Sequence, residues 1–118
     1  MALGCCGIAP ATAQGPIEVG QPVLLARYTD VQPGSCRALM APVVTVAQAP
    51  ASGRLWIARG HAIERAAGCP PQRVPVSEVW YEAVQAGPAG LAAWDVRFQD
   101  AGAARRVQRV LDARAAAR

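Results

Sequence analysis

The residue best suited to acid–base or metal chemistry in this 118-residue chain is its single histidine, His61. With Cys69 it would form a thiol–imidazole pair, and with Glu64 it would form one edge of a metal site. A single histidine beside a glycine in a loop is usually exposed to solvent, and Cys69 has a better partner in Cys36. None of the common phosphate-loop, zinc-protease or serine-hydrolase motifs occurs. We therefore expect a protein that is not an enzyme and that uses no metal and no cofactor.

The adjacent pair Cys5-Cys6 offers no better metal site, because zinc uses cysteines spaced as CxxC and no second pair of ligands follows. The pair lies in a small, apolar segment, residues 1–14, which has no acidic residue and has Ala11-Thr12-Ala13 before Gln14. Signal peptidase recognises small residues one and three positions before its cut. We expect residues 1–14 to be a truncated export signal or a disordered N-terminus. The alternatives are lipidation of Cys5 and an ordinary cytosolic N-terminus.

Removal of this segment would leave two cysteines, Cys36 and Cys69. An even number of cysteines in an exported chain indicates a disulfide, which would stabilise the domain by roughly 3–4 kcal/mol. The alternative is a pair of buried free thiols in a cytosolic protein. We expect the disulfide, and a location in the periplasm or outside the cell.

The charge of the chain is modest. Its formal net charge is +4, and all twelve basic residues are arginines, several of them near the C-terminus. A basic end can attach to nucleic acid or to anionic lipid, but here no aromatic residue is interleaved with the arginines for base stacking. No run approaches the 18 apolar residues that indicate a membrane-spanning helix. We expect a monomer that has no nucleic-acid partner and no membrane span.

From residue 16 onward, short runs of strand-forming residues alternate with turns rich in Gly and Pro. The clearest strand is 92–99, where Trp94, Val96 and Phe98 alternate with polar residues. Residues 104–111 have apolar side chains at helical spacing, but a hairpin with the preceding strand favours a strand. The predicted strands are 22–28, 42–46, 54–59, 79–84, 92–99 and 104–111.

The stretches between these strands carry their own predictions. Gly53 can take the positive φ that a tight turn needs, and residues 87–90 form a second turn. Residues 61–67 are expected to make a helical turn. Six or seven short strands predict an all-β sandwich over residues 15–112, followed by an Ala/Arg-rich tail at 113–118.

Two motifs resemble the bacterial immunoglobulin-like, cadherin-like modules of exported proteins. Pro50, Gly53 and Leu55 match the "P-x-x-G-x-aliphatic" turn of those modules. Gly87, Gly90 and Trp94 match the glycines and the first aromatic residue of "G-x-x-G-x-D-x-F-x-Y", and Val79-Trp80-Tyr81 resembles the middle strand. The likeness covers roughly residues 33–99. It departs at Ala92 and Val96, which stand where the family has Asp and Tyr.

The resemblance implies an immunoglobulin-like antiparallel β-sandwich of about seven short strands with one disulfide, since Cys36 before the turn and Cys69 after it resemble a disulfide-bearing proteobacterial version. It also implies an exported, non-enzymatic structural or adhesive module of the periplasm or cell surface, with a protein or carbohydrate partner. It does not imply catalysis, and the departure at Ala92 removes any calcium-linked role that the family's Asp has there.

The three tryptophans are the remaining candidates for function. Trp80 and Trp94 are expected in the core. Trp56 alternates with Leu55 and Ile57, so it is either a core residue or an exposed platform for a carbohydrate. The alternative function is therefore a small secreted binding protein, an inhibitor or a carbohydrate or other ligand binder, that uses loop 60–72 and Trp56. The possible binding residues are Arg54, Trp56, Arg59 and His61.

Overall fold

The computed structural model describes residues 17–100 and 102–114. Within these ranges the chain is all-β and contains seven strands and no helix. No helix there has the length and hydropathy that crossing a membrane requires. The strands are β1 (Ile17–Glu18), β2 (Val23–Tyr28), β3 (Val43–Gln48), β4 (Gly53–Glu64), β5 (Gln72–Ala83), β6 (Gly87–Arg97) and β7 (Arg105–Arg114).

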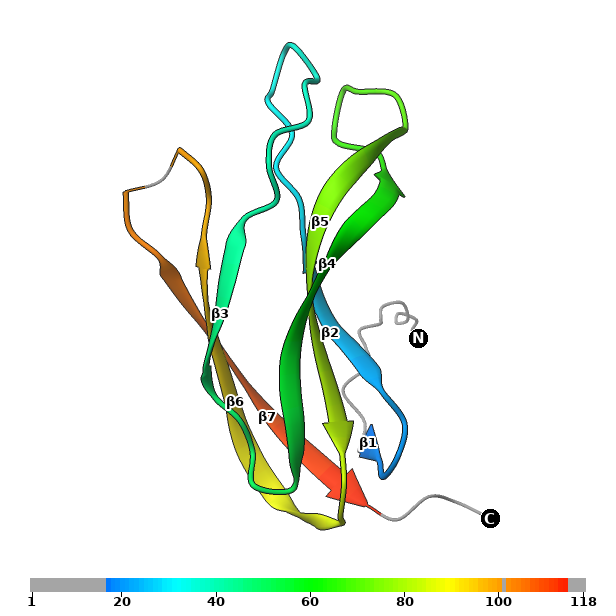
Figure 1. Cartoon of the computed structure of the whole chain (residues 1–118), viewed down its shortest axis with the longest axis vertical. Helices are drawn as coiled ribbons and strands as arrows, with labels where there is room; N and C mark the ends of the chain where they lie inside the picture. The colour runs from blue at the N-terminus through cyan, green and yellow to red at the C-terminus, as the bar shows by residue number, and fades with distance from the viewer. Residues whose placement is uncertain (1–16, 101, 115–118) are drawn as a thin grey trace, which may run out of the picture.

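The strands form two sheets that face each other (Figure 1). One sheet has the order β1-β7-β6-β3 and the other has the order β2-β5-β4. All pairs are antiparallel except β1 with β7. Strands β7-β6-β3 and β2-β5-β4 follow the order of G-F-C and B-E-D in an immunoglobulin sandwich. The predicted fold class, an antiparallel sandwich of about seven strands with one disulfide, is confirmed.

The core between the sheets consists mainly of side chains from β5 and β6. Trp94, Tyr81 and Val79 are fully buried, and Val96 is nearly so. Phe98 packs against the same cluster, so the alternation predicted for residues 94–98 is confirmed. Burying one large apolar side chain stabilises the fold by about 1.5–3 kcal/mol, which makes this alternating stretch a main contributor to stability.

The turn before β4 depends on glycine for a different reason from the one predicted. Gly53 is not among the glycines with positive φ, so that expectation was wrong. A Cβ at Gly53 would lie 2.5 Å from Tyr81 Oη and would also meet the Glu82 carbonyl oxygen. Ser52 Oγ lies 2.9 Å from the same Tyr81 Oη in a buried hydrogen bond. Close packing of the turn on β5 therefore requires glycine here.

Several element boundaries also differ from the predictions. Residues 60–64 continue β4 instead of starting a helical turn, because each of them pairs with β5. Residues 87–90 belong to β6, with a register shift between Gly87 and Gly90. Residues 105–111 of the predicted strand 104–111 do form a strand, as favoured, but β7 continues to Arg114 and buries Ala113. The sandwich therefore extends past residue 112.

Candidate functional site

A disulfide joins two loops at one end of the sandwich. Cys36, in the loop between β2 and β3, bonds to Cys69, in the loop between β4 and β5, with 5.6 Å between their Cα atoms. The two loops stand side by side at the top of Figure 1. Cys36 has a φ of 58°, which is uncommon for a residue other than glycine. Its backbone is held by a 2.8 Å hydrogen bond from Gln72 Nε2 to its carbonyl oxygen.

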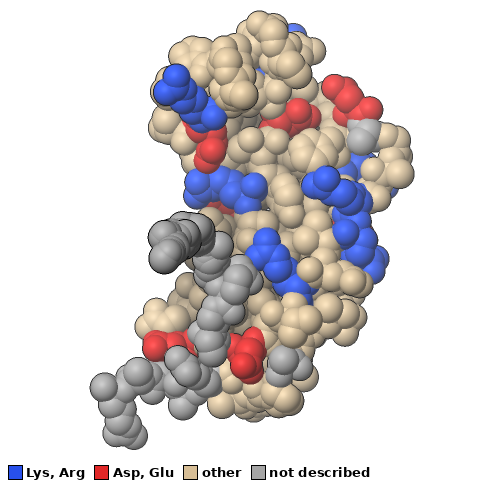
Figure 2. All heavy atoms as spheres, turned by 180° about the vertical axis from the view of Figure 1, so that it is seen from behind, with Lys and Arg blue, Asp and Glu red and all other residues tan. Residues whose placement is uncertain are grey.

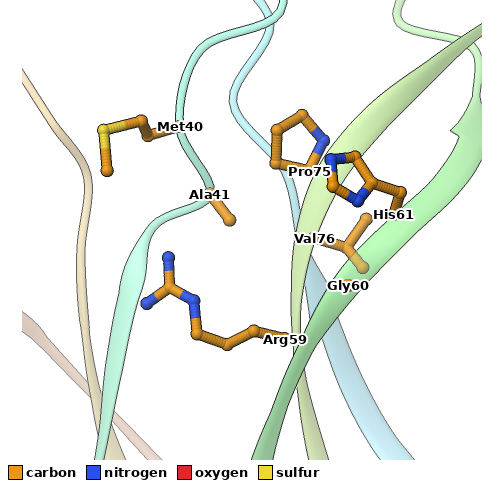
Figure 3. A pocket seen from close by; sticks show the side chains of 7 residues that line it. All are labelled: Met40, Ala41, Arg59, Gly60, His61, Pro75 and Val76. Carbon is orange, nitrogen blue, oxygen red and sulfur yellow. The ribbon is translucent and has the colours of Figure 1, made fainter.

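A hollow of about 450 Å³ lies below these loops, between β4 and the segment that leads into β3 (Figure 3). We call it the edge hollow, because it opens between the edge strands of the two sheets. Met40 stands on one side of it, and Arg59 extends from β4 towards the Met40–Ala41 segment. Among the described residues, its lining is Met40, Ala41, Arg59, Gly60, His61, Pro75 and Val76.

Met40 also borders a second hollow of about 120 Å³ on the side of the other sheet, which Arg97 and Phe98 help to line. The Met40 side chain is 66% exposed although it is large and apolar. No acidic residue of the described part of the chain lines either hollow. Neither Arg59 nor Arg97 forms an ion pair among the residues described. The surface around Met40 is thus apolar with an excess of positive charge, which suits a ligand with an apolar part and an anionic group.

Cys69 and Glu64, which the sequence suggested as chemical partners of His61, form other interactions in the structure. Cys69 is bonded to Cys36. Glu64 Oε2 forms an ion pair with Arg27 NH1 on β2, at a distance of 3.1 Å. In residues 17–100 and 102–114 there is no group of three or more His, Cys, Asp or Glu side chains placed to hold a metal ion. His61 is exposed and lines the edge hollow, where its imidazole nitrogens can form hydrogen bonds.

The outer face of the β2-β5-β4 sheet carries the other two tryptophans. Trp56 on β4 is the direct cross-strand neighbour of Trp80 on β5, and their rings are stacked with centroids 6.5 Å apart. Trp80 is half-buried on this outer face, opposite to its buried neighbours Val79 and Tyr81. The prediction that Trp80 belongs to the core with Trp94 is therefore wrong, and only Trp94 lies there.

Trp56 is half-buried and its ring is partly covered. The guanidinium of Arg54 lies 5.2 Å from the ring centroid, in the range of a cation–π contact. The same guanidinium pairs with Glu82 at 2.8 Å. Arg54 therefore lies over the Trp56 ring while it pairs with Glu82, and a sugar ring stacking on that face would have to displace it.

An ion network continues from this pair of tryptophans. Trp80 Nε1 donates a 3.0 Å hydrogen bond to Glu78 Oε1, and Arg27 NH2 lies 2.6 Å from Glu78 Oε2. The Trp80 hydrogen bond and then the Arg27 contacts lower the pKa of Glu78 below its ordinary value. The hydrogen bond to Glu78 also raises the pKa of Arg27. This network links all three strands of the sheet and has a structural role.

Seen from behind the view of Figure 1, the molecule has several basic side chains across its middle and acidic groups above and below them (Figure 2). One arginine of the other sheet, Arg106 on β7, pairs with Asp95 on β6 and lowers the pKa of that carboxyl. Cross-strand pairing of this kind on an exposed surface contributes little stability.

The four binding residues predicted from the sequence therefore separate into two places. Arg54 and Trp56 lie on the outer face of the sheet, whereas Arg59 and His61 line the edge hollow. Sequence reasoning missed Met40, whose large apolar side chain in a loop rich in Gly, Ser and Pro was the available signal. The predicted loop 60–72 is a loop only from 65 to 71. Cys5 lies outside the described residues.

Comparison of the chain with models of protein families, with curated proteins and with solved structures gave no match.

Proposed function

We propose that this chain is an exported, non-enzymatic binding module of the bacterial periplasm or cell surface, and that it holds its partner at the edge hollow. The observation that carries the proposal is the exposed Met40 between two hollows, whose lining includes Arg59, His61 and Arg97 and, within residues 17–100 and 102–114, no carboxylate. Methionine and arginine are enriched in protein interfaces, and methionine adapts its shape to different partners.

The disulfide supports the location. Disulfides persist in oxidising compartments and are rare in the cytosol. Cys36–Cys69 also restrains the two loops beside the hollow, so binding would lose less conformational entropy than it would with free loops. The strand order and the motifs around Pro50 and Gly87 support kinship with immunoglobulin-like, cadherin-like modules of exported proteins.

The edge hollow is the better candidate than the outer tryptophans. An aromatic platform for carbohydrate needs an accessible ring face, whereas Arg54 lies over Trp56 and is itself paired with Glu82. Breaking both contacts would be required before a sugar could stack. Met40, by contrast, is exposed without such a cover.

The location is tested by expressing the complete gene with its natural upstream codons and fractionating the cells. We expect the protein in the periplasm or medium, with Cys36 and Cys69 resistant to alkylation. A full-length cytosolic product with both thiols alkylated would contradict the proposal.

The binding role is tested by attaching the oxidised protein to a support and identifying, by mass spectrometry, the proteins that it retains from a periplasmic extract. We expect the variant M40S/H61A to lose the retained set. V110S is the matched control, because Val110 is 69% exposed on β7, away from the hollow, and it should retain the same set. Equal retention by M40S/H61A and the wild type would rule out the hollow.

A further inference from the structure

Strand β4 is the edge of its sheet and is regular along its whole length. It pairs with β5 at twelve consecutive positions, from Gly53 with Ala83 to Glu64 with Gln72, without a register shift. On its other side it has no partner strand among the residues described. An unpaired edge presents a row of N–H and C=O groups that can pair with another chain.

The other edge strands of the two sheets are shorter than β4 or have a shift in their pairing. The β2 pairing is shifted between Leu24 and Ala26, and the β3 pairing is shifted between Val46 and Gln48. Strand β1 has only two residues. Bulges and short edge strands are the usual protection of a sheet against added strands. Among the edge strands in the described part of the chain, β4 alone is both long and without a register shift.

The side chains of β4 leave room for an added strand. Ala58, Gly60 and Ala62 are small and occupy alternate positions on one face. A Cβ at Gly60 would have no atom within 4 Å. There is no proline within Gly53–Glu64 to remove a hydrogen-bond donor. Between Ala58 and Ala62, therefore, no large side chain on this face and no proline stands against a neighbouring chain.

The side chains on the opposite face of β4 determine which residues an added strand should carry. Arg59, His61 and Ile63 occupy alternate positions, so they share one face. Arg59 and His61 line the edge hollow, and Ile63 is 67% exposed. Residues directly opposite across two strands contact each other, and pairs of opposite charge are favourable. The complementary strand has acidic residues opposite Arg59 and His61 and an apolar residue opposite Ile63.

We propose that β4 binds an extended acidic peptide segment of a partner protein by strand addition over Arg59–Ile63, with its carboxylates at Arg59 and His61. Main-chain pairing then supplies affinity and the alternate side chains supply selectivity. This inference rests on the proposed binding function and names the class of partner.

A second copy of this chain does not place a carboxylate opposite Arg59. When two copies of β4 pair antiparallel with their faces matched, Arg59 meets another residue at an odd position of the strand. Those residues are Gly53, Leu55, Ile57, Arg59, His61 and Ile63, and none has a carboxylate. Charge complementarity therefore favours an acidic partner over self-association.

The probe is a blocked, fluorescein-labelled heptapeptide, Thr-Leu-Thr-Glu-Thr-Glu-Thr, titrated with the oxidised protein and followed by fluorescence anisotropy. The comparison peptides have Lys in place of both Glu, or N-methyl groups on alternate amides in the two possible phases. We expect the Glu peptide to bind at least tenfold more tightly than the Lys peptide. The N-methylated peptide whose blocked amides face β4 should bind at least tenfold more weakly, whereas the peptide of the other phase, whose blocked amides face away from β4, should keep its affinity.

Arg59→Glu should lower affinity for the Glu peptide at least tenfold and raise affinity for the Lys peptide. Arg105→Glu, which makes the same charge change on exposed β7, is the control and should leave both affinities within twofold. The inference is overturned if N-methylation has no effect, if the Lys peptide binds as well as the Glu peptide, or if the wild type dimerises through β4. Failure of the peptides while M40S/H61A still loses its retained proteins would overturn strand addition and leave the proposed function standing.

Discussion

The indole of Trp94 donates a hydrogen bond of 2.9 Å from Nε1 to the phenol oxygen of Tyr28. Trp94 lies on β6 and Tyr28 on β2, so the bond joins the two sheets through the core. The Trp94 side chain is fully buried, and a buried indole N–H without an acceptor is costly. Apolar packing is non-directional, whereas this bond favours one lateral placement of the sheets.

Tyr28→Phe removes only the hydroxyl that accepts this hydrogen bond. We expect the free energy of unfolding to fall by roughly 1–2 kcal/mol, because Trp94 Nε1 is then left without its partner. Urea denaturation followed by tryptophan fluorescence measures the change. Trp94→Phe and the double variant complete a cycle, in which the two losses should be less than additive. Full additivity would mean that the two groups do not interact.

Gly53→Ala tests the close packing of the turn on β5. The new Cβ would overlap Tyr81 Oη and the Glu82 carbonyl oxygen, so we expect a loss of roughly 1–3 kcal/mol in unfolding free energy. Gly60→Ala is the matched control on the same strand, since its Cβ meets nothing within 4 Å, and it should change stability by about 0.5 kcal/mol or less. Equal effects of the two changes would contradict this explanation.

The disulfide is tested with the double variant Cys36→Ser and Cys69→Ser, which leaves no unpaired thiol in either loop. The bridge spans 33 residues, so we expect the free energy of unfolding to fall by roughly 3–4 kcal/mol through the gain in chain entropy of the unfolded state. Reduced wild-type protein should show a similar loss in urea denaturation. A midpoint unchanged by reduction would contradict this role.

Glu78 should make stability depend on pH in the acidic range. Its pKa is lowered from 4.5 in the folded protein, mainly by the hydrogen bond from Trp80 and then by Arg27. Between the two pKa values the unfolded chain binds more protons, so the contribution is complete above the ordinary pKa and is lost as pH falls through the lowered one.

Glu78→Gln removes this titration and keeps an acceptor for Trp80. Its unfolding free energy should lie below that of the wild type at pH 6, and the difference should shrink steadily from about pH 5 to pH 3. Urea denaturation at several pH values measures the difference. The variant Asp95→Asn provides the comparison with Glu78→Gln, because Asp95 is a carboxyl at the surface of the other sheet and pairs with Arg106. A difference that stays constant with pH would contradict the role of Glu78.

Much of the fold follows from short-range features of the chain. Prolines and glycines divide it into strands, and the alternation at Trp94, Val96 and Phe98 identifies the side that faces the core. Each of these signals acts over a few residues, which is why they predicted six of the strands and the sandwich. The even count of cysteines after residue 14 predicted the Cys36–Cys69 bond in the same way.

The placement of the candidate binding residues required the tertiary structure. The sequence placed Arg54, Trp56 and Arg59 on a predicted strand and His61 in the turn after it, and the four were grouped as possible binding residues. Trp56 faces Trp80 on the outside of the sheet, whereas Arg59 lies beside the edge hollow. Alternation along a strand does not say which of its faces meets the other sheet, because that depends on the partner strand.

The sequence by itself determined the strand pattern, the all-β class and the pairing of two cysteines, because local backbone preference and cysteine count specify these. Only the tertiary structure decided that Met40 and Arg59 line the same hollow, and that Tyr81 occupies the space where a Cβ at Gly53 would lie. It also decided that β4 is a regular edge strand. These are contacts between segments far apart in the chain. They arise when two twisted sheets pack face to face, and no local preference of either segment encodes them.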